Sequence, residues 1–335
     1  MLNPAEFTTR HHESGDLGQP AISAFQAMIL AHYHKMARSM PWRETRDPYA
    51  VLVSEIMLQQ TQVERVRLKY DEFLGRFPTL AALASAPLSD VLKVWQGLGY
   101  NRRAIYLKRC AEEIVARYNG IFPATVNELQ ALPGIGPYTA RAVAAFCFDV
   151  SEPLIETNIR TVYIHFFFHG HDMVSDRAIM PLVAATLDHD NPRQWYYALM
   201  DYGVMLKQLH PNPGQRSRHY TRQSRFEGSN RQLRSRLLRQ IIAQPGVTVK
   251  QLLALIPAER DIILGNLETM QREGFLVKKG RGYRVFDEAT LGEQKVQHLA
   301  GSVETGVNDL GQASLDDVQS AATPSPDTPH HPHAP

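Results

Sequence analysis

An acidic residue in an apolar helical segment is the first feature of this 335-residue sequence that could do chemistry. Glu55 lies in the segment 53–63 among valine, isoleucine, methionine and leucine residues, and Gln59, Gln60 and Thr61 follow it. Apolar surroundings raise the pKa of a carboxyl group by desolvation, which suits a general acid. Glutamine amides can hydrogen-bond to the edges of nucleic-acid bases. A solvated glutamate with ordinary polar neighbours is the alternative.

Two closely spaced glycines form the second feature. In the segment 132–140, Leu132 and Pro133 are followed by Gly134, Ile135, Gly136 and Pro137. This pattern predicts that one helix ends near Leu132, that the glycines make a tight hairpin, and that another helix begins near Pro137. Free N–H groups at such a helix start form an anion site that could hold a DNA phosphate. A plain turn between two helices is the alternative.

The elements that position these residues follow the helical period. Apolar residues recur at helical spacing in segments 22–39, 49–77, 80–86, 88–96, 102–118 and 126–131, of which 49–77 is one long helix or two. The main body contains no alternating strand pattern. The predicted fold class of the main body is therefore all-α.

Composition and charge limit the kind of protein. The net charge is +2, but residues 286–335 hold one lysine and eight acidic residues, which leaves +9 on residues 1–285 and favours a polyanion partner. Cys110 and Cys147 are the only cysteines, too few for a four-cysteine metal or iron–sulfur site. No segment is apolar enough to span a membrane and no leader pattern begins the sequence, so we expect a cytoplasmic, nucleoid-associated protein.

Several motifs together resemble those of adenine DNA glycosylases of the MutY-like group, within the helix-hairpin-helix and endonuclease III superfamily. The resemblance covers residues 42–203 and is carried by segments 41–43, 47–49, 53–63, 95–100 and 132–140, with 200–203 resembling the segment that precedes the family's cluster loop. It implies a two-lobed helix-hairpin-helix fold and an enzyme that flips a base out of the duplex and hydrolyses its N-glycosidic bond.

The resemblance also implies catalytic roles. Glu55 falls where the family has the acid that protonates the departing purine, and Glu156 falls where it has an aspartate that stabilises the positively charged sugar. The side chain of Glu156 is one methylene longer than that aspartate. Tyr138 stands where bifunctional relatives have a lysine nucleophile, and because a phenol cannot form a Schiff base we expect base removal without efficient strand cleavage. The DNA contacts that we expect are Trp42, Arg43, Gln59, Gln60, Thr61, Tyr100, Gly134, Gly136, Thr139, Arg216 and Arg218.

Three departures from the family pattern matter. Residues 204–229 lack the four cysteines that usually hold a 4Fe-4S cluster, so we expect no cluster, no other cofactor and no metal. Arginines including Arg216 and Arg218 stand there instead, and predict a basic loop on DNA phosphates, the alternative being a solvated charged face. Asn101 replaces a second tyrosine after Tyr100, with Arg102 or Arg103 as assisting DNA contacts. The segment 230–286, with three helical patterns and two paired strands at 274–277 and 283–285, resembles a winged helix.

The predicted organisation has four parts: a flexible N-terminus (1–21), a glycosylase domain (22–229), a winged-helix-like domain (230–286) and a disordered acidic tail (287–335). The predicted function is a monofunctional DNA repair glycosylase that acts as a monomer on mispaired or damaged duplex DNA, with adenine opposite 8-oxoguanine or guanine as the leading substrate. A thymine or uracil mismatch glycosylase is one alternative. A non-catalytic DNA-binding protein, in which Glu156 marks a decayed site, is another.

Overall fold

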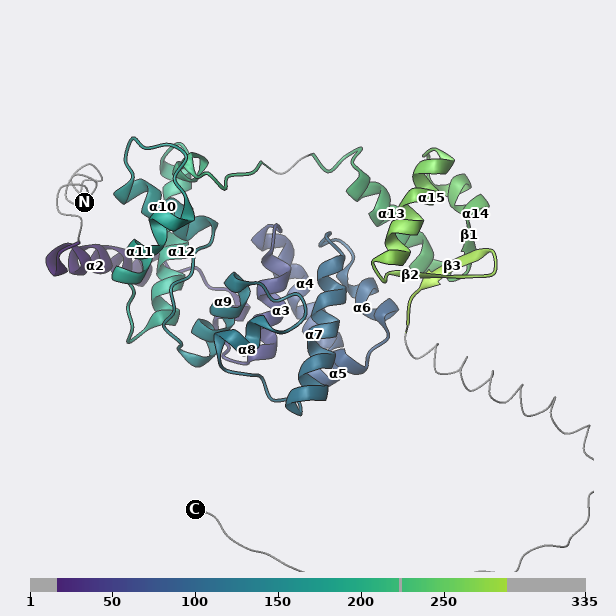
Figure 1. Ribbon diagram of the computed structural model, residues 1–335, viewed down its shortest axis with the longest axis horizontal. Helices are drawn as coiled ribbons and strands as arrows, with labels where there is room; N and C mark the ends of the chain where they lie inside the picture. The colour runs from purple at the N-terminus through teal and green to yellow at the C-terminus, as the bar shows by residue number, and fades with distance from the viewer. Residues whose placement is uncertain (1–16, 223–224, 288–335) are drawn as a thin grey trace, which may run out of the picture. The chain divides into compact units, whose positions relative to one another are not determined.

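The computed structural model describes residues 17–222 and 225–287, and these are mainly helical, which confirms the predicted fold class (Figure 1). One lobe consists of α3 (Pro48–Leu58), α4 (Val63–Arg76), α5 (Leu80–Ser85), α6 (Leu88–Trp95), α7 (Arg102–Tyr118), α8 (Val126–Gln130) and α9 (Pro137–Phe148). A second lobe consists of α2 (Gln19–Met36), α10 (Thr157–Phe167), α11 (Asp176–Ala185), α12 (Pro192–Leu209) and η2 (Pro213–Arg216). Contacts between α9 and α12 join the two lobes.

An aromatic cluster around Phe25 holds the second lobe together. The ring centroid of Phe25 lies 5.2 to 6.0 Å from those of Tyr163, Phe166 and Phe167 on α10 and Trp195 on α12. Most of these pairs are edge-to-face, an arrangement that aromatic rings prefer. Because α2 supplies the central ring, it is an integral helix of this lobe. It begins at residue 19, so residues 19–21 belong to it rather than to the predicted flexible N-terminus; residues 1–16 lie outside the described residues.

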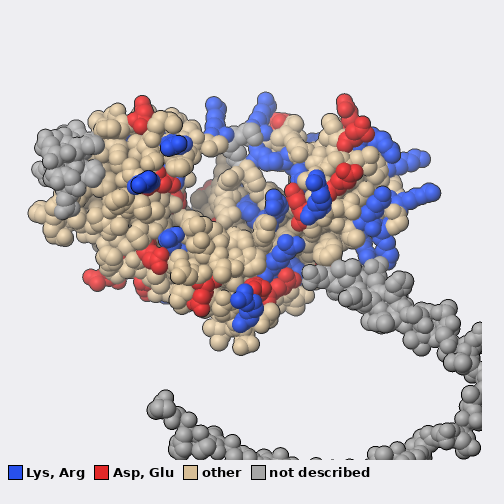
Figure 2. Space-filling model, viewed as in Figure 1, with Lys and Arg blue, Asp and Glu red and all other residues tan. Residues whose placement is uncertain are grey.

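The C-terminal unit has the predicted three helices and hairpin. Its elements are α13 (Asn230–Ala243), β1 (Val247–Thr248), α14 (Val249–Leu255), α15 (Arg260–Arg272), β2 (Leu276–Lys279) and β3 (Gly282–Val285), and its strands form an antiparallel sheet in the order β1-β3-β2. The two-residue strand β1 is too short to leave a sequence pattern. Residues 230–286 hold eleven lysines and arginines against four acidic residues. Figure 2 shows these basic side chains gathered over the unit, on the right of the view. The predicted tail lies outside the described residues except for Asp287.

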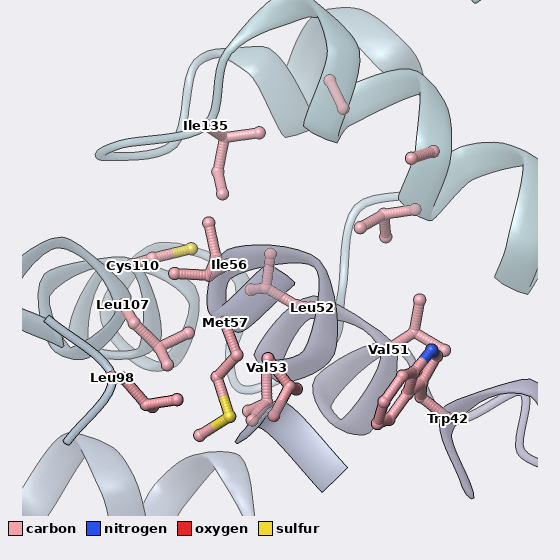
Figure 3. Packing of buried hydrophobic residues seen from close by; sticks show 14 of the residues in the cluster. Trp42, Val51, Leu52, Val53, Ile56, Met57, Leu98, Leu107, Cys110 and Ile135 are labelled. Atoms are coloured by element: carbon pink, nitrogen blue, oxygen red, sulfur yellow. The ribbon is translucent and has the colours of Figure 1, made fainter. Parts of the chain in front are cut away.

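Helix α3 is the most deeply buried helix of the first lobe. All nine residues from Tyr49 to Met57 are buried, as expected for a helix that is apolar on every side. Figure 3 shows Ile56 of α3 facing Cys110 of α7 and Ile135 of the glycine hairpin. The segment 49–77 forms two helices, α3 and α4, which are separated at residues 59–62. Glu55, near the end of α3, is therefore carried into the interior.

A buried ion pair joins the turn η1 (Pro41–Arg43), which precedes α3, to α12. Asp201, whose side chain is 1% exposed, accepts hydrogen bonds from Arg43 at 2.9 Å and from Arg38 Nε at 2.6 Å. Burial raises the pKa of Asp201, but the hydrogen bonds and charge of Arg43 outweigh it and the pKa lies below its ordinary value. The pair fixes the start of α3 against the second lobe.

We expect Asp201→Asn to lower the free energy of unfolding by about 3 to 5 kcal/mol, because it leaves the guanidinium of Arg43 buried without a carboxylate. Urea denaturation of the purified protein measures the change. Asp149→Asn is the matched control, since Asp149 pairs with Arg46 on the surface, where both side chains are about half exposed, and its loss should stay below about 1 kcal/mol. Equal losses for the two variants would contradict the role of Asp201.

Candidate functional site

Glu55 is a buried carboxyl group with few polar neighbours. It is 7% exposed, and its pKa is raised to about 7, mainly by burial and to a smaller extent by the negative charge of Glu156. A hydrogen bond with the hydroxyl of Tyr138 acts in the opposite direction. A group with this pKa is about half protonated at neutral pH, so it can donate a proton. The desolvation expected from the sequence is therefore present in the fold.

The glycine hairpin brings Tyr138 to Glu55. Gly136 is the N-cap of α9 and Pro137 its first residue, so that Tyr138 lies in the first turn and hydrogen-bonds with the Glu55 carboxyl group. Burial raises the pKa of Tyr138 well above its ordinary value, and the charges of Glu55 and Glu156 raise it further. Tyr138 therefore stays neutral, and it lies within electrostatic reach of both carboxyl groups.

Glu156 caps the start of α10. Its Oε1 accepts the backbone N–H groups of Asn158 at 2.6 Å and Ile159 at 2.8 Å, and Oε2 accepts Asn158 Nδ2 at 3.2 Å. Burial raises the pKa of Glu156, against the lowering effect of the Ile159 N–H and of the Lys207 ammonium. The carboxylate is held where the helix macrodipole favours negative charge. The extra methylene is thus taken up within a helix cap, the geometry that shorter acidic residues usually adopt.

The sequence predicts that Arg103 assists in DNA contacts. The structure places its guanidinium against the backbone carbonyl groups at the C-terminal end of α3 instead. The guanidinium lies 5.4 Å from the Trp95 ring and 5.6 Å from that of Tyr100, and burial lowers its pKa to about 10, so it stays charged. It also donates to Thr61 Oγ1 at 3.1 Å. Six of its acceptors are backbone oxygens, those of Ile56, Met57 and Gln59 at 2.6 to 2.8 Å and of Leu98, Gly99 and Tyr100 at 3.0 to 3.4 Å. Arg103 thereby ties the loop after α3 to the loop before α7.

These two loops present the exposed candidates for contact with a ligand. Gln60 is exposed with φ 53°, and Gln59 lies near Thr139, with 3.4 Å between Nε2 and Oγ1. Tyr100 is 37% exposed with φ 47°. Arg231 of α13 donates to the Tyr100 hydroxyl at 2.5 Å and lies over its ring at 5.2 Å. The C-terminal unit therefore reaches the loop that carries Tyr100.

Several side chains that the sequence predicts to contact DNA are buried in the structure. Trp42 is 4% exposed and packs edge-to-face on Tyr70, and the side chain of Arg43 is 7% exposed and bound to Asp201. Thr139 is 2% exposed. These side chains stabilise the fold and do not reach the surface, because partners distant in the sequence enclose them.

Arg216 is also turned inward. It donates to the carbonyl oxygens of Phe168 at 2.7 Å and Ile164 at 3.3 Å, near the end of α10. A parallel bridge between Val174 and Ser217 holds the same segment. Arg216 is thus a structural residue, whereas Arg218 is exposed and stays a predicted phosphate contact.

The segment after α12, where the family that the sequence resembles usually holds a 4Fe-4S cluster, does not contain residues that fit one. Cys110 is buried on α7 and Cys147 lies on α9, and neither belongs to the segment after α12. The part of the chain that the structure describes holds no group of three or more histidine, cysteine, aspartate or glutamate residues placed to bind a metal ion. Hydrogen bonds from Arg216 to the end of α10 hold this segment instead.

Sequence reasoning missed the groups that hold the site in place. Asp201 lies in a motif segment but received no role, and Lys207, which donates to Asn158 Oδ1 at 2.7 Å beside Glu156, was not considered. Lys207 follows Asp201 by six residues on one apolar helix, and a lysine in such a helix is the signal that could have indicated a buried acidic partner.

Comparison with known proteins agrees with this geometry. Residues 53–189 match the model of the HhH-GPD superfamily base excision DNA repair protein. The chain is 39% identical over 180 residues to an adenine DNA glycosylase of Mycolicibacterium smegmatis, covering 53% of this chain and 61% of the relative. It is 35% identical over 187 residues to that of Buchnera aphidicola, covering 54% and 52%. The structure of a thermostable thymine-DNA glycosylase aligns with a TM-score of 0.51 and 26% identity, over 57% of this chain and 89% of that one.

The helical fold and the glycine hairpin are thus similar to those of helix-hairpin-helix proteins. This match to the HhH-GPD superfamily model covers less than half of the chain, so it shows what the segment 53–189 is similar to. The chain spans between half and about three fifths of the length of the two curated relatives named above. In the described residues, no helix is both long and apolar enough to cross a membrane.

The raised pKa of Glu55 makes stability depend on pH. Because the folded pKa of about 7 exceeds the ordinary value of 4.5, the folded state binds more protons between these values and stability falls as pH rises through them. We expect Glu55→Gln to match the wild type near pH 4.5 and to be more stable by about 3 kcal/mol at pH 8. Urea denaturation across this pH range measures the difference, with the exposed Glu64→Gln as control. A constant difference between wild type and Glu55→Gln would contradict the assignment.

Proposed function

We propose that this protein is a monofunctional DNA glycosylase that flips a mispaired base out of duplex DNA and hydrolyses its N-glycosidic bond. Adenine opposite 8-oxoguanine or guanine is the proposed substrate, and the protein acts as a monomer on nucleoid DNA. The observation that carries the proposal is the carboxyl group of Glu55, which is buried, has a pKa of about 7 and lies beside Tyr138 within the electrostatic influence of Glu156.

The two carboxyl groups have environments suited to different tasks. Protonated Glu55 donates its proton to the departing adenine as the bond between the base and C1′ breaks. Glu156, whose carboxyl group accepts hydrogen bonds from backbone N–H groups, stabilises in its ionised form the positive charge that develops on the sugar. Water then adds to C1′ and gives its proton to the Glu55 carboxylate, which restores the acid.

The hairpin residue that hydrogen-bonds with Glu55 is a tyrosine rather than a lysine, which supports hydrolysis without strand cleavage. The position in the hairpin that carries lysine in bifunctional enzymes is Tyr138, whose phenol is neutral and hydrogen-bonded to Glu55. A phenol cannot form the imine that strand cleavage requires. We therefore propose that the product is an intact strand with an abasic site.

The names of two relatives favour adenine as the excised base, whereas the name of one structurally similar protein favours a pyrimidine. Two relatives at 39% and 35% identity are named adenine DNA glycosylase, whereas a structural neighbour is a thymine-DNA glycosylase. Excision of thymine or uracil from a mispair is therefore the second candidate function. Glu55 favours adenine, because a purine needs protonation to leave while a pyrimidine can leave as an anion.

Single-turnover assays on end-labelled duplexes with A·8-oxoguanine, A·G, T·G and U·G pairs test the proposal. We expect strand breaks at adenine that appear only after alkali treatment. Glu55→Gln and Glu156→Gln should each lower the rate at least a hundredfold, the size typical for acid–base groups, while both still bind the duplex and Glu64→Gln keeps the wild-type rate.

Two other outcomes of these assays would contradict the proposal for adenine. Cleavage only at thymine or uracil would identify the second candidate. Binding without product from any duplex would favour a non-catalytic DNA-binding protein.

The hairpin gives an independent test of DNA binding. At Gly134, with φ 77°, a Cβ atom would lie 2.5 Å from Tyr106 Cβ, whereas a Cβ at Gly136 would meet no atom within 4 Å. We expect Gly134→Ala to lower the free energy of unfolding by about 2 to 4 kcal/mol through strain and overlap. Gly136→Ala should keep its stability within about 1 kcal/mol, because the space beside it is open, yet bind duplex DNA at least fivefold more weakly. Unchanged affinity of Gly136→Ala, measured by fluorescence anisotropy, would show that no phosphate approaches there.

A further inference from the structure

A groove of about 410 Å³ lies where α7 meets the end of α15. Arg102, Tyr106 and Arg109 of α7 line one side, and Thr269, Arg272 and Glu273 line the other. Three of these six side chains are arginines, and the groove opens to solvent. None of them belongs to the catalytic residues proposed above.

The charges in this groove are not balanced. Glu273 is bound to Arg234 of α13 and lies 4.0 Å from Arg102, so its single negative charge is shared. Arg109 and Arg272 have no carboxylate partner among the described residues, and Arg272 donates only to Thr269 Oγ1 at 3.3 Å. Two exposed guanidinium groups therefore remain for an anion from outside the chain.

The groove is continuous with the glycine hairpin through one side chain. The Cβ of Tyr106 occupies the space beside Gly134, and the Tyr106 hydroxyl accepts a hydrogen bond from Arg102 at 3.2 Å within the groove. Arg109 extends across it, since a Cβ at Gly274 would lie 3.0 Å from Arg109 Nη2. The groove and the glycine hairpin thus share the side chain of Tyr106.

We propose that this groove, formed by Arg102, Arg109 and Arg272 between α7 and the C-terminal unit, binds a backbone phosphate of duplex DNA near the phosphate held by the hairpin. This inference rests on the proposed function, in that it takes DNA as the ligand. Arginine suits the site because its planar guanidinium donates two parallel hydrogen bonds to a phosphate. The C-terminal unit then lengthens the DNA-binding face without contacting a base.

The test is the salt dependence of DNA binding by the double variant Arg109→Ala/Arg272→Ala. Fluorescence anisotropy with an A·8-oxoguanine duplex measures Kd between 50 and 300 mM salt. We expect the slope of log Kd against log salt to decrease by about 1, because one lost phosphate contact contributes roughly 0.9. Near 0.1 M salt the affinity should fall about tenfold.

Two further variants separate charge from structure. Arg109→Lys/Arg272→Lys keeps both charges and should keep most of the slope. Arg117→Ala, an exposed arginine on the same helix that pairs with Glu113 outside the groove, should bind as the wild type does. Thermal denaturation confirms that each variant is folded before its Kd is compared.

The groove proposal and the proposed function can be overturned independently of each other. If the wild type excises adenine but the double alanine variant keeps the wild-type Kd and slope, the groove proposal is overturned while the function stands. If the wild type binds DNA without excision and the variant shows the reduced slope, the groove stands and the function fails. Calorimetry with inorganic phosphate completes the test, since loss of phosphate binding in the variant with DNA binding unchanged would assign the groove to a free anion and overturn the proposal.

Discussion

The burial of one carboxyl group, that of Glu55, is the constraint on which the site depends. Helix α3 is buried from Tyr49 to Met57, so Glu55 has little water around it and its pKa rises to about 7. The neighbours that do reach it are Tyr138, from the hairpin, and the charge of Glu156, from the start of α10. Proton donation at neutral pH follows from the packing of the first lobe, since burial contributes most to the raised pKa.

Two arginines keep this buried helix in place at its opposite ends. Arg43 binds Asp201 of α12 before α3 begins, and Arg103 binds the carbonyl groups with which α3 ends. Each arginine donates hydrogen bonds to polar groups that would otherwise be buried without partners. Arg103 also fixes the loop that carries Tyr100, so the position of this exposed ring is coupled to the same helix that holds the acid.

The sequence predicted what depends on local pattern. Helical periodicity gave the order of the helices, the paired glycines gave the hairpin, and the apolar neighbours of Glu55 gave its desolvation. It did not predict which arginines face inward, because Arg43 binds Asp201, a residue 158 positions away. Arg216, which the sequence predicts on a basic DNA-binding loop, likewise binds residues distant in the sequence, the carbonyl oxygens of Phe168 and Ile164. The inward position of Arg103 cannot be predicted from a complementary acidic side chain in the sequence, since most of its partners are backbone oxygens.

The rate of adenine excision as a function of pH tests the role of Glu55 most directly. Single-turnover rates on an A·8-oxoguanine duplex between pH 5.5 and 9 report the protonation state of the acid. Because only protonated Glu55 donates a proton, the rate should fall about tenfold per pH unit above a pH near 7, where the pKa of Glu55 lies. A rate that stays constant across this range would contradict the account, because the proton would then come from another source.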